Sequence, residues 1–206
     1  MTHCCLSLAF LFTLLSAGSS LICYECFNST GTYCRGSPIT CPSTSTSCIK
    51  TVEIARIGNA ILKSFSRGCN DNEQLCNKDV IMNSGAGNKV IRIVNTCCHE
   101  DYCNDCIVRA PPYNVTLNTL LCPVCFKHSS YRCLSSGYIK CRGRETQCMN
   151  IAATLVREDN STFKFSLMGS GCSTQDGCSA GPKMMPTSKV VDVTRLSCVP
   201  ALPITH

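Results

Sequence analysis

The sequence predicts an all-β protein made of two tandem modules that disulfide bonds hold together. Cysteine supplies 21 of the 206 residues, a proportion typical of small disulfide-bonded extracellular domains. The spacing of these cysteines repeats once along the chain. No stretch combines apolar residues at helical spacing with capping residues at its ends, whereas several segments are rich in β-branched residues. These observations favour strands joined by cross-links over a helical protein.

The first 20 residues are expected to be a secretory signal peptide, cleaved near Ser20. The apolar run CCLSLAFLFTLLSA covers residues 4–17 and is followed by Gly18 and Ser19. At 14 residues it is too short to cross a bilayer but fits the apolar region of a signal. The residues before the run include no Lys or Arg, so the charged start of a signal is weak. A buried core segment is the alternative.

The rest of the chain is expected to be secreted without a membrane anchor. After Ser20 no apolar run approaches 18 residues, and the end of the chain, LSCVPALPITH, has no hydrophobic tail. The sequence therefore predicts an extracellular protein.

The cysteines after the signal fall into two series with matching intervals. The first series has intervals of 2, 7, 6, 6, 20, 6, 20, 0 and 4 residues, and the second has 2, 7, 7, 6, 23, 5 and 19. The openings also match, since CYECF begins the first series and CPVCF begins the second. Repetition at this length indicates two copies of one module. The expected domains are residues 21–106 and 122–206, with a linker at 107–121 that contains Pro111-Pro112.

The long intervals between cysteines are expected to form β-hairpins. In KTVEIARIGNAILKSFS, two β-prone arms flank a turn at Gly58-Asn59. In DVIMNSGAGNKVIRIVN the turn would be SGAGN, and in the second module IAATLV and FKFSLM flank REDNST. Each module holds few aromatic residues, so its apolar core would be marginal alone. Disulfide bonds are expected to supply the missing stability.

No metal site, cofactor or catalytic activity is expected. The two C-x2-C pairs and the Cys97-Cys98-His99 run could suggest zinc, but an oxidising secretory route converts such thiolates to disulfides. His99, Glu100 and Asp101 are expected to be solvated turn residues. The chain has four histidines and no G-x-S-x-G or H-E-x-x-H motif, so we do not expect an enzyme.

The net charge of +6 lies entirely in the second half of the chain. Residues 21–106 hold eight basic and eight acidic residues, whereas residues 107–206 hold eleven and five. A patch of this kind could attract an acidic protein, a sulfated glycan or an anionic membrane surface, and a solvated face is the simpler alternative. No nucleic-acid motif accompanies it, so we expect no nucleic-acid partner. The basic or titratable side chains in this stretch are Lys127, His128, Arg132, Lys140, Arg142 and Arg144.

The cysteine spacing resembles the three-finger module of the urokinase-receptor and lymphocyte-antigen superfamily. The features that carry the resemblance are the opening C-x2-C, the 20-residue hairpin interval and the CC-x4-C-N ending at Asn104. The resemblance implies three fingers, at residues 27–40, 49–68 and 77–96, and an Asn104 side chain that packs into the base of the module. The disulfides it implies are Cys23–Cys48, Cys26–Cys34, Cys41–Cys69, Cys76–Cys97 and Cys98–Cys103.

The second module lacks the last disulfide and the closing asparagine of the first. The pairs that the resemblance implies there are Cys122–Cys148, Cys125–Cys133, Cys141–Cys172 and Cys178–Cys198. Cys106 is left over, so it is a free thiol, a bridge between two chains, or a sign that the pairing nearby differs.

The two-module layout is similar to that of γ-type phospholipase A2 inhibitors and of sodefrin-precursor-like pheromone proteins. The run from Gly143 to Cys148, GRETQC, favours the inhibitor type. The resemblance thus implies a non-enzymatic binding protein whose partner is a secreted phospholipase A2, or alternatively a receptor that reads an extracellular signal. A glycan-binding surface protein that uses the basic patch is a third hypothesis. Homo-oligomers are common in the family.

Three glycosylation sequons stand in the predicted mature chain. Asn114 in the linker and Asn160 at a predicted fingertip are expected to be exposed. Asn28 falls in a tight loop close to Cys26, where occupancy is less favoured.

Overall fold

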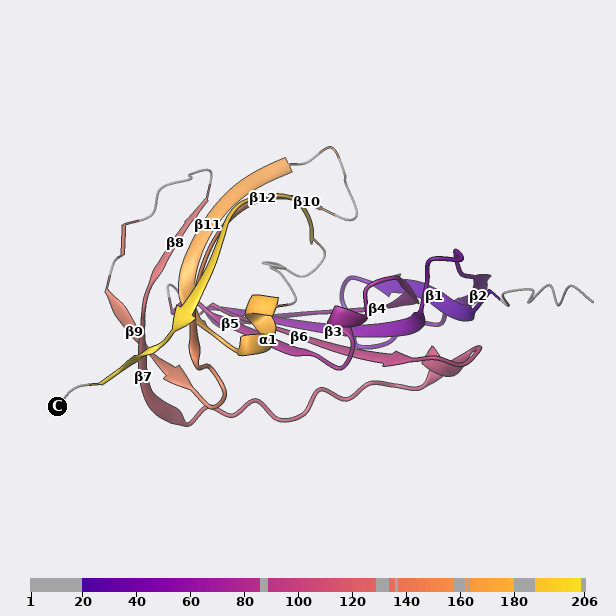
Figure 1. The fold of residues 1–206 in the computed structure, drawn as a ribbon, viewed down its shortest axis with the longest axis horizontal. Coiled ribbons are helices and arrows are strands. Elements are labelled where there is room, and N and C mark those ends of the chain that lie inside the picture. Colours follow the sequence, from indigo (N-terminus) through magenta and orange to yellow (C-terminus); the bar gives the residue numbers. More distant parts are fainter. Residues whose placement is uncertain are drawn as a thin grey trace, which may run out of the picture.

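The computed structural model describes residues 20–85, 89–128, 134–135, 137–157, 162, 164–179 and 188–204. In these residues the chain is almost entirely β-structure, so the predicted all-β class is confirmed (Figure 1). Its short helical segments are η1 (Glu73–Leu75), η2 (Cys103–Asp105) and α1 (Gln175–Ser179). None of the helices in this part of the chain is long and apolar enough to span a bilayer. The strands are β1 (Ile22–Asn28), β2 (Ser37–Thr40), β3 (Ser47–Ile57), β4 (Ala60–Asn70), β5 (Asp79–Asn83), β6 (Val90–Cys98), β7 (Leu117–Pro123), β8 (Cys125–His128), β9 (Tyr138–Arg142), β10 (Gln147–Arg157), β11 (Lys164–Ser173), β12 (Ser188–Pro200) and β13 (Leu202–Pro203).

Three antiparallel hairpins form the first module: β1–β2, β3–β4 and β5–β6. The central hairpin is the longest because β3 and β4 are uninterrupted runs of β-prone residues that meet at the predicted turn. Gly58 occupies that turn with a φ of 61°, a conformation that glycine adopts without steric cost. The fingers are joined side by side because β6 pairs with β3 and β4 pairs with β1.

The second module repeats much of this plan but differs at its edge. Strands β10 and β11 form the long hairpin, β12 pairs with β10, and β8 pairs with β11. In the first module the outermost finger has two strands, β5 and β6. In the described residues of the second module, β12 has no further strand beside it and forms the edge of the sheet.

The linker is shorter than the sequence predicts. Strand β7 begins at Leu117, inside the expected linker at 107–121, and pairs with β9 and β13 in a small sheet of its own. The segment that connects the two modules is therefore 107–116. It runs in extended form along the first module before it reaches β7 (Figure 1).

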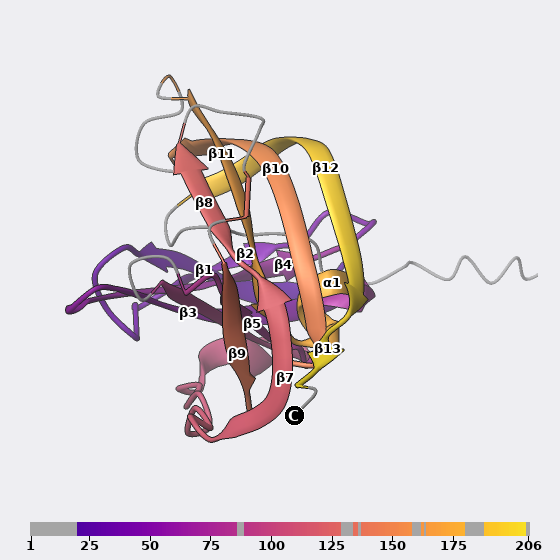
Figure 2. The same cartoon turned by 90° about the vertical axis from the view of Figure 1, so that its left-hand side faces the viewer.

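The two modules share one continuous ten-stranded sheet. Its order is β12-β10-β11-β5-β6-β3-β4-β1-β2, with β8 also paired to β11. The modules meet where Asn83 and Met82 of β5 pair with Cys172 and Ser173 of β11. From that point the strands of the second module turn away from those of the first, as the two views show (Figures 1 and 2).

The apolar cores are small, and one of them crosses the module boundary. In the first module, Ala55, Val80, Ile91 and Ile93 form one cluster. In the second, Met82 of β5 packs with Met149, Ile151, Ala153 and Leu155, so a residue of the first module completes the core of the second. Two further clusters consist mainly of buried cysteines at the bases of the modules. Covalent links thus occupy positions that large apolar side chains fill in bigger domains.

Eight disulfides are formed in the described residues, with Cα–Cα separations of 5.2 to 6.1 Å, within the usual range. They coincide with eight of the nine pairs that the family resemblance implies. Cys125 is also disulfide-bonded, but its expected partner, Cys133, lies outside the described residues. Cys106 is a free, exposed cysteine. The formed bonds are Cys23–Cys48, Cys26–Cys34, Cys41–Cys69, Cys76–Cys97, Cys98–Cys103, Cys122–Cys148, Cys141–Cys172 and Cys178–Cys198.

Asn104 ties the end of the first module to its first strand. Its side chain is fully buried. The amide oxygen accepts from the backbone N–H of Tyr24 at 2.9 Å, and the amide nitrogen donates to the Tyr24 carbonyl at 2.9 Å. One side chain thus satisfies both polar groups of a backbone position in β1, as a neighbouring strand would do.

Candidate binding sites at the module junction and on the outer strand

Strand β5 carries most of the polar contacts between the modules. Beyond its short pairing with β11, its Ile81 exchanges hydrogen bonds with Thr174: Thr174 N–H donates to the Ile81 carbonyl at 3.1 Å, and Ile81 N–H donates to Thr174 Oγ1 at 3.1 Å. The Ser173 hydroxyl donates to the same carbonyl at 2.9 Å. At the start of the strand, Lys78 pairs with Asp176 of α1 at 3.1 Å. The second module therefore holds the outer edge of β5 by specific hydrogen bonds.

A carboxylate with two arginines lies beside this contact. Asp79 of β5 is paired with Arg92 of β6 through two hydrogen bonds of 2.7 Å. Its second oxygen also accepts from Arg144 of the second module at 2.6 Å. Arg92 is nearly completely buried, and its remaining guanidinium nitrogen donates to the carbonyl of Pro111 in the connecting segment. Asp79 thus links both modules and, through Arg92, the segment that joins them.

Glu145 is a second buried carboxylate at the junction. Its side chain accepts from the Tyr113 hydroxyl at 2.7 Å, from the backbone N–H of Arg142 at 2.9 Å and from the Asn83 amide at 3.4 Å. Burial raises the pKa of the Glu145 carboxyl above its ordinary value. Burial and the hydrogen bond to Glu145 also raise the pKa of the Tyr113 phenol. Glu145 therefore joins residues of the first module, the connecting segment and the second module.

The structure uses part of the predicted basic patch at this junction. Arg144 is ion-paired with Asp79, and its side chain remains 66% exposed. Arg142 is half-buried beside it. Lys127 on β8 and Lys140 on β9 are exposed and belong to different sheets. Arg132 lies outside the described residues, as does the side chain of His128.

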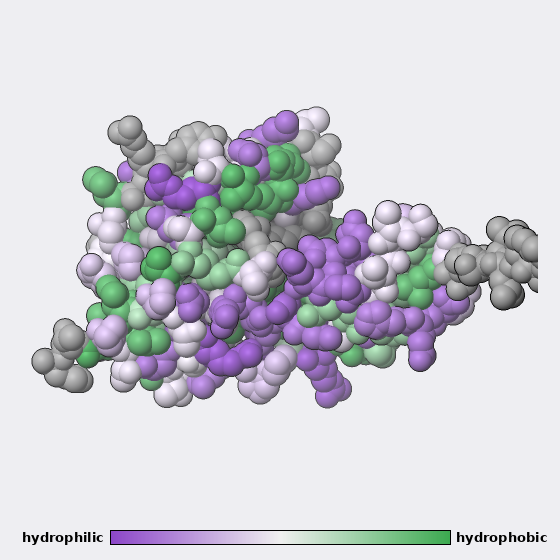
Figure 3. Space-filling view, in the orientation of Figure 1, coloured by the Kyte–Doolittle hydropathy of each residue, from purple (hydrophilic) through white to green (hydrophobic). Residues whose placement is uncertain are grey.

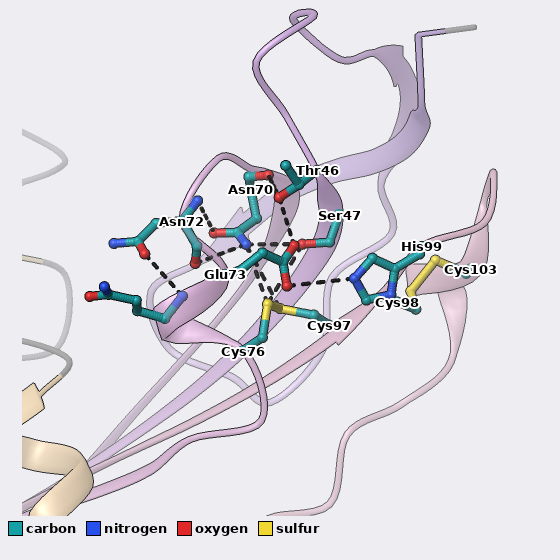
Figure 4. Close-up of polar contacts among 11 residues, drawn as sticks. Thr46, Ser47, Asn70, Asn72, Glu73, Cys76, Cys97, Cys98, His99 and Cys103 are labelled. Atoms are coloured by element: carbon teal, nitrogen blue, oxygen red, sulfur yellow. Dashed lines mark hydrogen bonds and ion pairs between the residues drawn. A yellow bond between two sulfur atoms is a disulfide. The ribbon is translucent and has the colours of Figure 1, made fainter. Parts of the chain in front are cut away.

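Residues at the base of the first module make several polar contacts. His99 Nε2 lies 3.5 Å from the Glu73 carboxylate (Figure 4). Asp101 accepts from the Ile22 N–H at 2.8 Å. A 2.6 Å hydrogen bond from Thr46 lowers the pKa of the Glu73 carboxyl. His99, Glu100 and Asp101 are exposed and lie in a turn region, as expected, and His99 and Asp101 also have partners within the base.

Cys106 lies beside a buried cation. Lys50 of β3 is almost fully buried and its ammonium donates to Cys106 Sγ at 2.9 Å. This hydrogen bond lowers the pKa of the Cys106 thiol. On the neighbouring strand, directly opposite Lys50, Arg67 is bonded to Asp105 at 2.9 Å. The Cys106 thiol and the Asp105 carboxylate therefore lie beside the cationic groups of Lys50 and Arg67.

The sequons lie in different surroundings. The Asn28 amide donates to the Tyr33 carbonyl at 2.8 Å, and its oxygen accepts from the Thr30 N–H, so this side chain is engaged with its own loop. Asn114 is exposed, and its oxygen accepts from the Thr116 N–H at 2.9 Å. Asn160 lies outside the described residues.

The outer strand β12 exposes an apolar strip. We define this β12 strip as Val191, Val193 and Leu196, which are 48%, 42% and 39% exposed. Figure 3 shows hydrophobic surface in this region of the second module. Exposed apolar residues gathered on an edge strand are typical of an interaction surface.

Register explains why part of the β12 strip is apolar. Val193 lies opposite Ala153 and Leu196 lies opposite Ile151, and directly opposed residues share one face of a sheet. Ala153 and Ile151 belong to the core of the module. The core face thus continues onto the sheet edge, where the described residues leave it partly exposed.

Sequence reasoning did not find Asp79, Glu145 or the β12 strip. An acidic residue within a polar stretch of sequence does not indicate that its side chain is buried. Glu145 enters the sequence analysis only as part of the GRETQC run, which favours the inhibitor type. The alternation of Val191 and Val193 predicts a strand but does not reveal that the strand lies at an edge. The burial of Asp79 and Glu145 and the edge position of β12 are set by contacts between segments that are far apart in the sequence.

Comparison with known proteins agrees with the two-module description. The u-PAR/Ly-6 domain family matches residues 19–106 and 118–202. The chain is 28% identical to "Phospholipase A2 inhibitor NAI" of Notechis ater over 98% of its own length and 96% of that protein. It is 29% identical to "Protein RoBo-1" of Rattus norvegicus over 52% of its length, a match that spans 42% of RoBo-1. The crystal structure of mouse TEX101 covers 85% of this chain and 95% of its own, at 16% identity and a TM-score of 0.36.

Proposed function

The chain belongs to the u-PAR/Ly-6 domain family, and from this premise we propose that it is a secreted, non-enzymatic inhibitor of secreted phospholipase A2. The observation that carries the proposal is the similarity to a phospholipase A2 inhibitor along nearly the whole of both chains. The apolar N-terminal run supports secretion, with cleavage of a signal peptide near Ser20.

The inhibitor acts by occupying the surface with which the enzyme approaches a membrane. Binding requires a rigid, partly apolar surface, and the β12 strip supplies one on a sheet that disulfides and the module junction hold in place. Apolar residues at the centre of an interface, surrounded by polar ones, contribute most of the binding free energy.

The proposal is tested by measuring hydrolysis of phospholipid vesicles by several secreted phospholipases A2 with increasing amounts of this protein. We expect inhibition that saturates at a fixed ratio of protein to enzyme and that survives changes in vesicle concentration. If the protein at about micromolar excess inhibits none of these enzymes, the proposal is contradicted.

A pair of matched variants locates the contact. Val193→Glu places a charge in the β12 strip and is expected to weaken inhibition about tenfold or more. Ile61→Glu makes the same kind of change at an exposed residue of β4, which is 51% exposed, and is expected to leave inhibition unchanged. The reverse result would place the contact on the first module and contradict its assignment to β12.

A further inference from the structure

A cleft lies between the connecting segment and the first module. It consists of two cavities of about 320 and 270 Å³ that share Arg92, Pro111, Tyr113 and Arg142 in their linings. One side is formed by the segment 107–116, and the other by β3, β5 and β6, with Arg142 and Arg144 of the second module at the junction. We call this space the strap cleft. Its size is near the lower end of the range for small-molecule sites.

The sheet side of the strap cleft combines apolar and cationic side chains. Ile54 lies opposite Arg92, and Arg56 lies opposite Val90, so these four residues project from the same face of the sheet. Their neighbours Ala55 and Ile91 point the other way, into the core. Ala110 and Val115 line the cleft from the connecting segment. An apolar floor therefore lies directly beside guanidinium groups.

The cations of this region outnumber its carboxylates. Arg56, Arg92, Arg142 and Arg144 line the cavities, and the carboxylates that contact them are Asp79 and Glu145. Asp79 is already shared by Arg92 and Arg144. Two of the four positive charges thus have no matching carboxylate in the part of the chain that the structure describes.

Arg142 lies close to the Glu145 carboxylate, but one of its side-chain donors is unsatisfied among the described residues. Its backbone N–H donates to Glu145, but its side-chain Nε is buried and has no hydrogen-bond partner in the part of the chain that the structure describes. Leaving a buried donor of a charged group unpaired costs free energy. Arg142 lines both cavities, so an anion in the cleft would be adjacent to it.

We propose that the strap cleft binds an amphiphile with one anionic head group and one apolar chain. The head, a carboxylate or a phosphate monoester, pairs with Arg142 and Arg144, and the chain lies along Ile54, Val90 and Val115. Planar guanidinium groups bind both head groups through paired hydrogen bonds. Binding at this site does not depend on inhibition of a phospholipase, because the cleft and the β12 strip use different residues.

The proposal is tested by calorimetric titration of the full-length secreted protein with four probes below their aggregation concentrations. Decanoate and decyl phosphate carry both features, decanol lacks the charge, and inorganic phosphate lacks the chain. We expect at least one of the two anionic amphiphiles to bind about tenfold more tightly than either decanol or inorganic phosphate. The stronger of the two identifies the head group. Two results would overturn the proposal. In the first, decanol or inorganic phosphate binds as tightly as both anionic amphiphiles, and in the second, none of the four probes binds.

Variants place the bound probe. Arg142→Gln is expected to weaken binding of the anionic amphiphile about tenfold, whereas Lys140→Gln, a matched loss of charge at an exposed residue outside the cleft, leaves it unchanged. Val115→Ser is a second variant, for use if Arg142→Gln does not fold, because Val115 is 61% exposed and its replacement leaves the fold intact. This change is expected to weaken binding of the anionic amphiphile but not binding of inorganic phosphate. If the Arg142 and Val115 variants bind the anionic amphiphile as tightly as the unchanged protein does, the proposed site is wrong.

Discussion

At the scale of single residues, a few buried polar side chains determine how the chain closes on itself. Asn104, Asp79 and Glu145 each connect segments that are far apart in sequence. The role of Asn104 could be predicted because the CC-x4-C-N ending resembles a known module. The roles of Asp79 and Glu145 could not, because their partners come from the other module or the connecting segment.

Asn104→Ala is expected to lower the free energy of unfolding by about 2 to 3 kcal/mol. The change leaves the part-buried N–H and carbonyl of Tyr24 without their Asn104 partner, which is more costly than loss of a surface hydrogen bond. Denaturant unfolding with the disulfides intact measures the effect. Asn59→Ala at the exposed β3–β4 turn is the matched control, and an equal effect of both changes would show that the Tyr24 contact is unimportant.

At the scale of strands, the sequence predicts hairpins but not the way in which they are joined. Each hairpin has its own β-branched arms and its own turn, so β3–β4 and β10–β11 follow from local pattern. The pairing of β5 with β11 follows from contacts between residues about 90 positions apart, and no local pattern signals it. The start of β7 at Leu117 was missed for the same reason, since its partners β9 and β13 lie later in the chain.

Gly171→Val is expected to separate β11 from β5. A Cβ atom at Gly171 would lie 2.1 Å from the carbonyl oxygen of Asn83 and 2.7 Å from Ser84 Cα, so the backbones must move apart. Hydrogen exchange should become faster at the amides of β5 that face the second module, including that of Ile81. Gly68→Val in β4 is the control, because no atom lies within 4 Å of the corresponding Cβ position. Unchanged exchange in the Gly171 variant would contradict the close contact.

At the scale of the whole molecule, two disulfide-bonded modules form one sheet whose outer strand is left exposed. Cross-links at each base replace a large core, and Met82 completes the core of the other module. The connecting segment is fastened at Pro111 and Tyr113. This arrangement keeps the β12 strip and the strap cleft in fixed positions relative to each other. The count of modules could be predicted from cysteine spacing, but their relative orientation could not.

The docking of the modules is expected to depend on pH through Glu145. Its pKa is raised in the folded protein, so the folded state binds the proton more tightly than the unfolded chain. The resulting stability is fully present below the ordinary pKa of the carboxyl and is lost as pH rises through the raised value. Glu145→Gln removes this dependence and can still bond to Tyr113 and to the Arg142 N–H.

The measurement is the free energy of unfolding of both proteins from about pH 4 to about pH 8. The variant should gain stability relative to the unchanged protein as pH rises. Glu25→Gln, at an exposed position of β1, is the control and should show no such trend. A difference between the Glu145 variant and the unchanged protein that stays constant with pH would contradict the assignment.

The most direct test of the central claim is a binding titration between this protein and a secreted phospholipase A2 with no lipid present. We predict a saturable complex in the micromolar range or tighter, about tenfold weaker for Val193→Glu and unaffected by Ile61→Glu. Inhibition of vesicle hydrolysis without any complex in solution would mean that the protein acts on the lipid surface, and the claim that it works by binding the enzyme would be wrong.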